Sequence, residues 1–266
     1  MDMARRIPLK TFSIQRSGVE WTDYALNFWY GCSRISPACM NCYAEIMTGR
    51  FPKRFNHATW GVDGVRSKYE HSAEKAAALN SRGRRSGELV KVFSNDMSDI
   101  FEDNEKLVEW RREAFEIIRE SKNIAWLLLT KRADKIAGML PPDFFDGEYR
   151  HVNLGVTCES PVYLWRLDEL RKLPDWGGLR WVSNEPALQP IHEKANLKKI
   201  DWLIYGGESA VKSRLRLDND DWARGIMGRC REAGIPFFYK QNAASPGKHR
   251  KVLDGLRIYE WPEFRR

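Results

Sequence analysis

The chain has 266 residues, of which 42% are hydrophobic and 30% are charged, and its formal net charge is +8. This length and composition are typical of a globular protein with a substantial core. They exclude a membrane-spanning chain, because no apolar run approaches the length of a bilayer span. The first residues are not followed by the apolar core of a signal peptide, so we expect a cytoplasmic protein.

We expect the whole chain, 1–266, to form a single domain, with a polar N-terminal lead-in over 1–20 and a C-terminal extension over 243–266. The positive charge favours an anionic partner such as nucleic acid or a nucleotide. Two basic runs, at 81–87 and 248–251, are candidates for that contact. Each run is equally compatible with a solvated loop.

The first predicted elements surround a group of cysteines. An apolar strand is predicted over 26–30, and a helix is predicted to begin at Cys42. Between them, Cys32, Cys39 and Cys42 have the spacing C-x6-C-x2-C, which allows three thiolates to serve one metal centre. The odd total of five cysteines argues against a disulfide framework and for metal binding in a reducing compartment.

Three interpretations of this group stay open on spacing alone. Three sulfurs can hold an iron–sulfur cluster that keeps one iron free for a non-protein ligand. They can also hold zinc if a fourth ligand, such as His57 or His71, completes the tetrahedron. The third interpretation is three unrelated thiols. The other two cysteines, Cys158 and Cys230, are predicted to be structural.

Helices and strands alternate from residue 70 onward. Helices are predicted over 70–80, 104–120, 131–139, 161–173 and 218–233, and strands over 90–94, 124–130, 152–157, 179–183, 200–205 and 235–240. Continuous apolar strands that alternate with helices are typical of a parallel sheet covered by helices. Six or seven such units favour an α/β barrel or partial barrel over a small doubly wound sheet.

Polar or small residues follow the predicted strands. In parallel α/β folds the site lies where the carboxyl ends of the strands meet the following loops, so we expect these residues to converge near the cysteines. The candidates are Ser94, Asn95, Asp96, Thr130, Lys131, Arg132, Thr157, Glu159, Glu185, Gly206, Gly207, Glu208 and Lys240.

These side chains suit several roles. Glu159 and Glu185 can bind ribose hydroxyls or transfer protons, and Lys131 can pair with a carboxylate or a phosphate. Gly206 and Gly207 allow the backbone to approach a ligand closely. Each also has a plain structural alternative, such as a helix cap, a surface ion pair or an ordinary turn.

Taken together, these motifs resemble the radical S-adenosylmethionine (SAM) enzymes, and more closely a phage-encoded, radical-SAM-like family. The matching stretches are Gly31-Cys32, Ser36-Pro37, Cys39, Asn41–Glu45, Met97–Phe101, Leu129–Arg132, Gly155–Thr157, Glu185-Pro186, Gly206–Ser209 and Phe238–Gln241. Three features depart from the common pattern. The first cysteine gap is longer than in C-x3-C-x2-C, and Asn41 stands where an aromatic residue usually precedes the third cysteine. The Gly-Gly-Glu stretch, at 206–208, lies late in the chain and not after the second strand.

The resemblance implies a partial (β/α) barrel of about six parallel strands that carries a [4Fe–4S] cluster on Cys32, Cys39 and Cys42. It implies that S-adenosylmethionine binds the fourth iron through its amino and carboxylate groups. An electron from an external donor would then cleave it to methionine and a 5′-deoxyadenosyl radical, which abstracts hydrogen from a substrate.

Among the other candidates, Ser94, Asn95 and Asp96 are better placed than the late Gly206–Glu208 segment to hold the amino group of the cofactor. Thr130, Lys131, Thr157, Glu159, Gly206, Gly207 and Glu208 are the remaining candidate cofactor contacts. Glu185 and Lys240 are the candidates for substrate contact or proton transfer.

The phage association and the basic charge suggest a modified nucleobase or nucleotide as the substrate, with isomerisation during thymidine or DNA hypermodification as the reaction. In that case the protein works in the cytoplasm of the host cell. Two other functions stay open: a radical DNA-repair lyase, and a zinc-stapled nucleic-acid-binding protein without catalysis. The sequence does not determine the oligomeric state.

Overall fold

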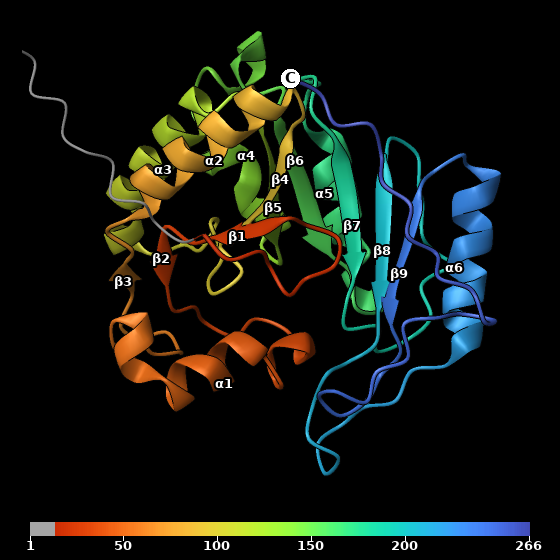
Figure 1. Cartoon of the computed structure of the whole chain (residues 1–266). Coiled ribbons are helices and arrows are strands. Elements are labelled where there is room, and N and C mark those ends of the chain that lie inside the picture. Colours follow the sequence, from red (N-terminus) through yellow and green to blue (C-terminus); the bar gives the residue numbers. More distant parts are fainter. Residues whose placement is uncertain (1–13) are drawn as a thin grey trace, which may run out of the picture.

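A curved sheet of parallel strands forms the centre of the molecule (Figure 1), which is represented by a computed structural model that describes residues 14–266. Within these residues the sheet has seven strands in the order β1-β4-β5-β6-β7-β8-β9, and every neighbouring pair is parallel. The strands are β1 (Tyr24–Leu26), β4 (Val90–Ser94), β5 (Ile124–Thr130), β6 (Val152–Thr157), β7 (Arg180–Asn184), β8 (Trp202–Gly206) and β9 (Phe237–Gln241). The spatial order of the strands follows their chain order and the sheet curls into a half-barrel (Figure 1), which confirms the predicted partial (β/α) barrel.

Helices cover the outer, convex face of this sheet (Figure 1). They are α2 (Ser72–Ser86), α3 (Val108–Glu120), α4 (Ile136–Met139), α5 (Trp165–Lys172) and α6 (Asp220–Glu232). Short helical turns precede or follow them: η3 (Glu105–Leu107), η4 (Ala133–Lys135), η5 (Phe144–Glu148) and η6 (Pro161–Tyr163). When the helical turns η3, η4 and η6 are counted with the helices they lead into, the predicted elements from residue 90 onward agree with these bounds to within two residues, the usual uncertainty at helix and strand ends.

The strands are mainly apolar because both faces of the sheet are buried. On the convex face, residues such as Trp126 and Leu128 pack against helical residues such as Phe115 and Ile118. On the concave face, a second cluster contains Trp21, Phe93, Leu127, Trp181, Trp202, Ile204 and Phe238. Gly155 makes room for this cluster, since a Cβ at its position would lie 2.3 Å from the Trp181 ring.

The segment just before β1 and the C-terminal segment cover the concave face of the sheet. Val19 and Trp21 precede β1 and pack into the concave cluster, and Tyr259 and Phe264 enter it from the C-terminal segment. Residues 258–260 also hydrogen-bond to β9. Part of the predicted lead-in, 1–13, lies outside the described residues.

The predicted strand over 26–30 is wrong in its bounds. The chain leaves the sheet after Leu26, and β2 (Trp29–Tyr30) pairs antiparallel with β3 (Ser67–Lys68). The intervening Asn27 turns its side chain to the β4 loop, where its Oδ1 accepts from the backbone N–H of Met97 at 2.9 Å. A local run of apolar residues does not reveal which part joins which sheet.

The interpretation of the basic run at 81–87 as a loop is also wrong, because residues 81–86 form the last part of α2. Gly83 suggests a helix break, yet it is needed there: a Cβ would lie 2.3 Å from the carbonyl oxygen of Asn123. The helix ends at Gly87, which has a φ of 74°. Since β4 begins three residues later, this basic run lies at the amino edge of the sheet.

Candidate functional site

A cavity opens at the carboxyl edge of the sheet, beneath the loop that carries the three cysteines. That loop contains η1 (Pro37–Cys39) and leads into α1 (Tyr43–Arg50) and η2 (Pro52–Phe55). The cavity volume is about 210 Å³, more than ten times the ~15 Å³ that a single water needs. It can therefore hold a small organic molecule.

Most of the predicted site residues line this cavity. They are Cys32, Cys39, Cys42, Asn95, Asp96, Thr130, Lys131, Arg132, Thr157, Glu185, Gly207, Glu208 and Lys240. Three predicted residues are not among the lining residues: Ser94, Glu159 and Gly206. Apart from the three cysteines, the predicted residues that line the cavity come from the ends of β4 to β9, so the geometry of a parallel half-barrel gathers them at one edge.

The three cysteine sulfurs share the cavity but do not converge on one point. Within residues 14–266, no three His, Cys, Asp or Glu side chains are arranged to hold a single metal ion. His57 and His71 are exposed and lie outside the cavity lining, so neither provides the fourth zinc ligand. An iron–sulfur cluster differs from zinc because each cysteine binds a different iron, so its ligand sulfurs stand apart. The donor set therefore fits a cluster better than a mononuclear zinc site.

Burial favours the protonated thiol at Cys32 and Cys42, because it raises the pKa of both side chains. It raises the pKa of Cys32 to about 12, although the neighbouring Arg132 acts in the opposite direction. Burial also raises the pKa of Cys42 above its usual value. A bound metal removes these protons, because the thiolate is the ligand.

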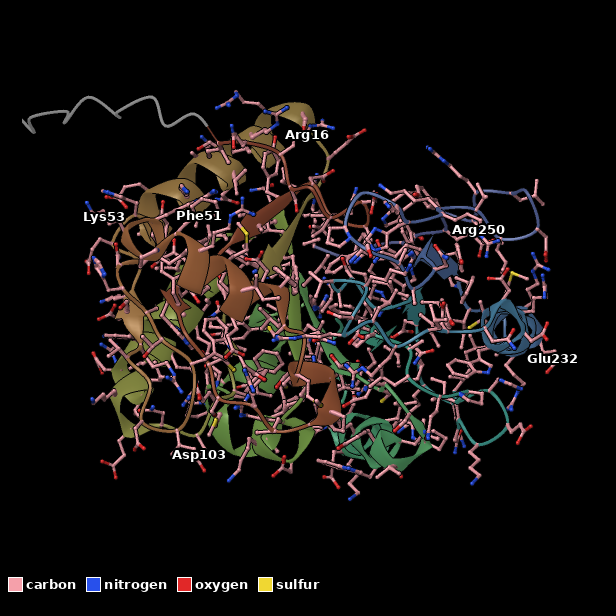
Figure 2. The ribbon with its side chains drawn as sticks, turned by 90° about the horizontal axis from the view of Figure 1, so that it is seen from below. Arg16, Phe51, Lys53, Asp103, Glu232 and Arg250 are labelled. Atoms are coloured by element: carbon pink, nitrogen blue, oxygen red, sulfur yellow. The ribbon has the colours of Figure 1, made fainter. Side chains whose placement is uncertain are left out.

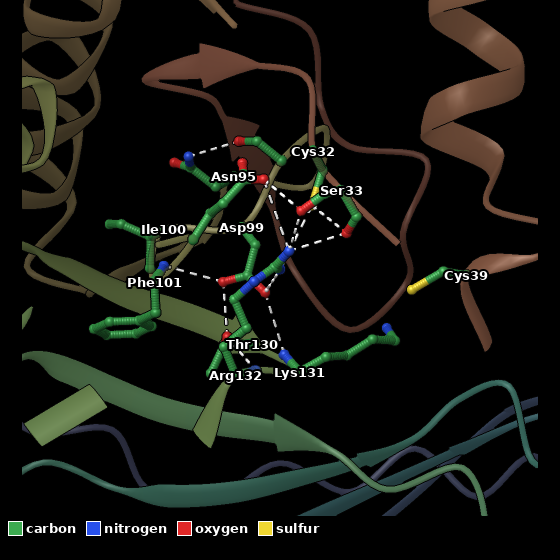
Figure 3. Close-up of polar contacts among 12 residues, drawn as sticks. Cys32, Ser33, Cys39, Asn95, Asp99, Ile100, Phe101, Thr130, Lys131 and Arg132 are labelled. Atoms are coloured by element: carbon green, nitrogen blue, oxygen red, sulfur yellow. Dashed lines mark hydrogen bonds and ion pairs between the residues drawn. The ribbon is translucent and has the colours of Figure 1, made fainter. Parts of the chain in front are cut away.

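Arg132 ties the cysteine loop to the sheet (Figure 3). Its Nη1 lies 3.6 Å from Cys32 Sγ and donates to Asp99 at 2.9 Å. Its Nη2 donates to the backbone carbonyl and the hydroxyl of Ser33 at 2.9 and 2.8 Å. The position of Cys32 therefore depends on a side chain 100 residues further along the chain.

Asp96 presents its carboxyl group to the cavity with two polar neighbours. Asn27 Nδ2 donates to Oδ1 at 2.5 Å, and the Tyr43 hydroxyl donates to the Asp96 backbone carbonyl at 2.8 Å and lies 3.3 Å from Oδ2. Burial raises the pKa of Asp96 above its usual value. A cationic group of a ligand would restore a favourable charged state for this carboxylate.

Ser94 and Asn95 are occupied by their own loop. Asn95 Oδ1 accepts from Ser94 Oγ at 3.0 Å, and its Nδ2 donates to Ser98 Oγ at 2.7 Å. Asn95 also has a φ of 57°, a left-handed conformation that asparagine tolerates. These two residues shape the turn that aims Asp96 at the cavity.

Thr130, Lys131 and Thr157 form the middle of the cavity wall. Thr130 Oγ1 donates to Asp99 at 2.7 Å, so its hydroxyl is already engaged. Lys131 Nζ lies 3.4 Å from Thr157 Oγ1, at the hydrogen-bond limit. Lys131 therefore offers a nearby cation to an anionic ligand group.

Glu185 and Lys240 form an ion pair on the cavity wall. Lys240 Nζ donates to Glu185 Oε1 across the ends of β7 and β9. Their side chains retain 20% and 17% of their exposure, so both are open to the cavity. When a substrate binds, each of these two charged groups can exchange its contact with the other for a contact with a polar group of the substrate.

Glu159, in contrast, is enclosed. Its side chain is completely buried and its Oε2 accepts from Arg166 at 2.8 Å, which also donates to the Thr157 carbonyl. The strand-end position predicted a ligand contact for Glu159, but the chain turns the side chain away from the cavity and into this pair.

The two glycines serve packing within the protein. A Cβ on Gly206 would lie 3.1 Å from the Glu185 side chain, and one on Gly207 would lie 2.0 Å from the backbone nitrogen of Ala243. The backbone that approaches Gly207 is thus the protein's own, although the sequence predicted a ligand there.

The next residue, Glu208, is held by Arg216, whose Nη1 also donates to the Pro37 carbonyl at 2.9 Å. Burial opposes ionisation of Glu208, but the Arg216 hydrogen bonds hold its pKa below the usual value. Asn41 Nδ2 donates to the Arg214 carbonyl at 3.1 Å. The β8–α6 loop is therefore fastened to the cysteine loop.

Sequence reasoning missed the positioning contacts of Asn27, Tyr43 and Arg216. Tyr43 had one signal, since it directly follows the last cysteine of the group. Asn27 and Arg216 had none, because their partners lie 69 and 179 residues away in the chain.

Comparison with known proteins adds a family and a fold. Residues 16–258 match the family model described as "Protein of unknown function (DUF5131)". A variant of spore photoproduct lyase has a TM-score of 0.55 at 12% identity, covering 86% of this chain and 79% of that one. Another, with bound AdoMet and dinucleoside spore photoproduct, has a TM-score of 0.49 at 16% identity, covering 85% of this chain and 65% of that one. No curated protein matched the chain.

The half-barrel and its likeness to the first of these structures define a radical-SAM-like fold. The chain spans less than two thirds of the second structure's length. The match over most of the sequence shows that the chain belongs to the DUF5131 family. Within residues 14–266, no helix has both the length and the apolar character that crossing a bilayer requires.

Proposed function

We propose that this protein is a radical SAM enzyme that holds a [4Fe–4S] cluster on Cys32, Cys39 and Cys42. The observation that carries the proposal is the position of these thiols: they line one cavity at the carboxyl edge of a radical-SAM-like half-barrel. When bound and reduced by an external donor, the cluster supplies an electron that cleaves S-adenosylmethionine to methionine and a 5′-deoxyadenosyl radical.

The chain's own residues would orient the cofactor. Asp96, held by Asn27 and Tyr43, suits the positively charged amino group, and Lys131 suits the carboxylate. Trp21, Phe93 and Leu129 give the cavity an apolar floor that excludes water from a radical. Thr157 and Glu208 remain candidate polar contacts on the same wall.

Glu185 and Lys240 are our candidates for substrate contact. Both groups are open to the cavity, and as a contacting pair they can accept and donate hydrogen bonds to the edge of a nucleobase. In a rearrangement, they can hold or return a proton while the radical exchanges a hydrogen atom with the substrate.

The surface around the cavity supports a nucleotide or DNA substrate. Arg50, Lys53 and Arg54 are exposed on α1 and η2, and Lys248 and Arg250 are exposed beyond β9. Figure 2, which views the molecule from this edge, shows Lys53 and Arg250 on opposite sides. Basic side chains on both sides suit a phosphate backbone.

The preferred reaction is isomerisation of a modified thymidine nucleotide in phage DNA. A second candidate is a DNA-repair lyase, favoured by the fold likeness to spore photoproduct lyase. Duplex DNA containing modified thymine, ultraviolet-irradiated DNA and unmodified DNA should be compared, together with the free nucleotides. Conversion of only the irradiated DNA would replace the first candidate by the second. Binding that weakens steeply with salt would indicate the polymer.

The reaction class is tested by anaerobic purification with iron and sulfide analysis, followed by addition of dithionite and S-adenosylmethionine. We expect a brown protein that releases 5′-deoxyadenosine, and Cys39→Ala should lose both properties. The matched control is Cys230→Ala, because Cys230 is buried in α6 and outside the cavity lining. A colourless protein that carries zinc after anaerobic reconstitution would contradict the proposal.

A further inference from the structure

One buried arginine contacts a sulfur of the cysteine group. Arg132 is 7% exposed, and its Nη1 lies 3.6 Å from Cys32 Sγ. Figure 3 shows the guanidinium between the Cys32–Ser33 backbone and Asp99, while the Cys39 sulfur lies well apart from it. The Cys39 sulfur lies 3.8 Å from a neutral group, the Ser36 hydroxyl. Cys32 and Cys39 therefore have different hydrogen-bond partners.

The guanidinium is fixed from several directions. Asp99 accepts its Nη1 proton at 2.9 Å, and Ser33 accepts from Nη2 through both its carbonyl and its hydroxyl. Glu102 lies 3.7 Å from Nη2 and is itself bound by Arg66 at 2.6 and 2.8 Å. A charged group with this many partners cannot turn away from Cys32 without leaving buried polar atoms unpaired.

The strength of a hydrogen bond from Arg132 to Cys32 depends on the charge of the sulfur. A thiolate on iron accepts a stronger hydrogen bond from a cation than a neutral thiol does. Reduction adds negative charge to the cluster and its sulfurs, so the hydrogen bond stabilises the reduced form more than the oxidised form. Hydrogen bonds to the sulfurs are among the features that set cluster reduction potentials.

We propose that Arg132 is a positioning residue that donates a hydrogen bond to Cys32 in the cluster-loaded protein and raises the reduction potential of the cluster. This inference rests on the proposed function. Arg132 holds the first cysteine in place and makes the electron easier to accept from a donor. Asp99 moderates the effect, because its negative charge offsets part of the guanidinium charge.

The test is a redox titration of the anaerobically reconstituted full-length protein, followed by electron paramagnetic resonance. Arg132→Gln should shift the midpoint potential of the loaded fraction to a more negative value, and Arg132→Lys should shift it less. Asp99→Asn should shift it to a more positive value. Arg166→Gln is the matched control, since Arg166 is also buried in an ion pair but lies outside the cavity lining.

Opposite shifts in the Arg132 and Asp99 variants, with none in the Arg166 control, would support the inference. An unchanged midpoint in loaded Arg132→Gln, or an equal shift in the control, would overturn it. If Arg132→Gln fails to load, Asp99→Asn decides the question by the sign of its shift. Iron content and 5′-deoxyadenosine release by the wild-type protein report separately on the proposed function.

Discussion

Gly207 allows a sharp test of how the cavity wall is built. In Gly207→Ala, the new Cβ would lie 2.0 Å from the backbone nitrogen of Ala243 and 2.4 Å from the carbonyl carbon of Asn242. Backbone cannot rotate aside as a side chain can, so the ends of β8 and β9 must separate by about 1.5 Å to restore normal contact.

This separation strains two hydrogen bonds that join the strand ends. The Gly207 N–H donates to the Gln241 carbonyl at 2.8 Å, and the Ala244 N–H donates to the Glu208 carbonyl at 3.0 Å. Each is worth about 1 kcal/mol net, and overpacking adds about 1–3 kcal/mol. If both hydrogen bonds are lost, we expect Gly207→Ala to lower the free energy of unfolding by roughly 3–5 kcal/mol.

Urea denaturation of matched variants measures this change in the free energy of unfolding. Gly206→Ala should cost less than about 1 kcal/mol, because its Cβ meets only the movable Glu185 side chain at 3.1 Å. Gly228→Ala in α6 should be neutral or stabilising by up to about 1 kcal/mol, since nothing lies within 4 Å of its Cβ. Equal midpoints for the Gly206 and Gly207 variants would refute the close backbone approach.

Three further predictions concern charge. Asp96→Asn should weaken S-adenosylmethionine binding, measured by calorimetry, by at least tenfold. It should not lower the stability of the protein, because burial already disfavours the carboxylate. Unchanged binding would count against Asp96 as a cofactor contact. Burial lowers the pKa of His151 to about 4, so its contribution to stability is present above pH 6.5 and is lost as the pH falls toward 4. That loss amounts to roughly 3 kcal/mol, and His151→Gln should flatten the pH dependence of the urea midpoint over this range. Arg216→Gln should lower the free energy of unfolding by about 1–3 kcal/mol, because it leaves Glu208 buried without its cation. Hydrogen exchange in the cysteine loop should become faster. An unchanged exchange rate would show that the β8–α6 loop does not hold the cysteine loop in place.

The sequence by itself determined the architecture and the edge where the site lies. Helices that alternate with mainly apolar strands specify a parallel sheet covered by helices, because such strands must be buried on both faces. Polar residues after those strands and a compact cysteine group then share one edge. Hence 13 of the predicted residues line the cavity, although the prediction used no knowledge of their contacts.

Only the tertiary structure decided which strand-end residues face the cavity and which serve the frame. Glu159 and Glu185 occupy equivalent places after neighbouring strands, yet one is sealed against Arg166 and the other meets Lys240 at the cavity. Gly207 accommodates a backbone 36 residues later, and Arg132 reaches Cys32 from 100 residues away. Such choices depend on long-range packing and on the pairing of buried charges, and neither leaves a periodic signal in the sequence.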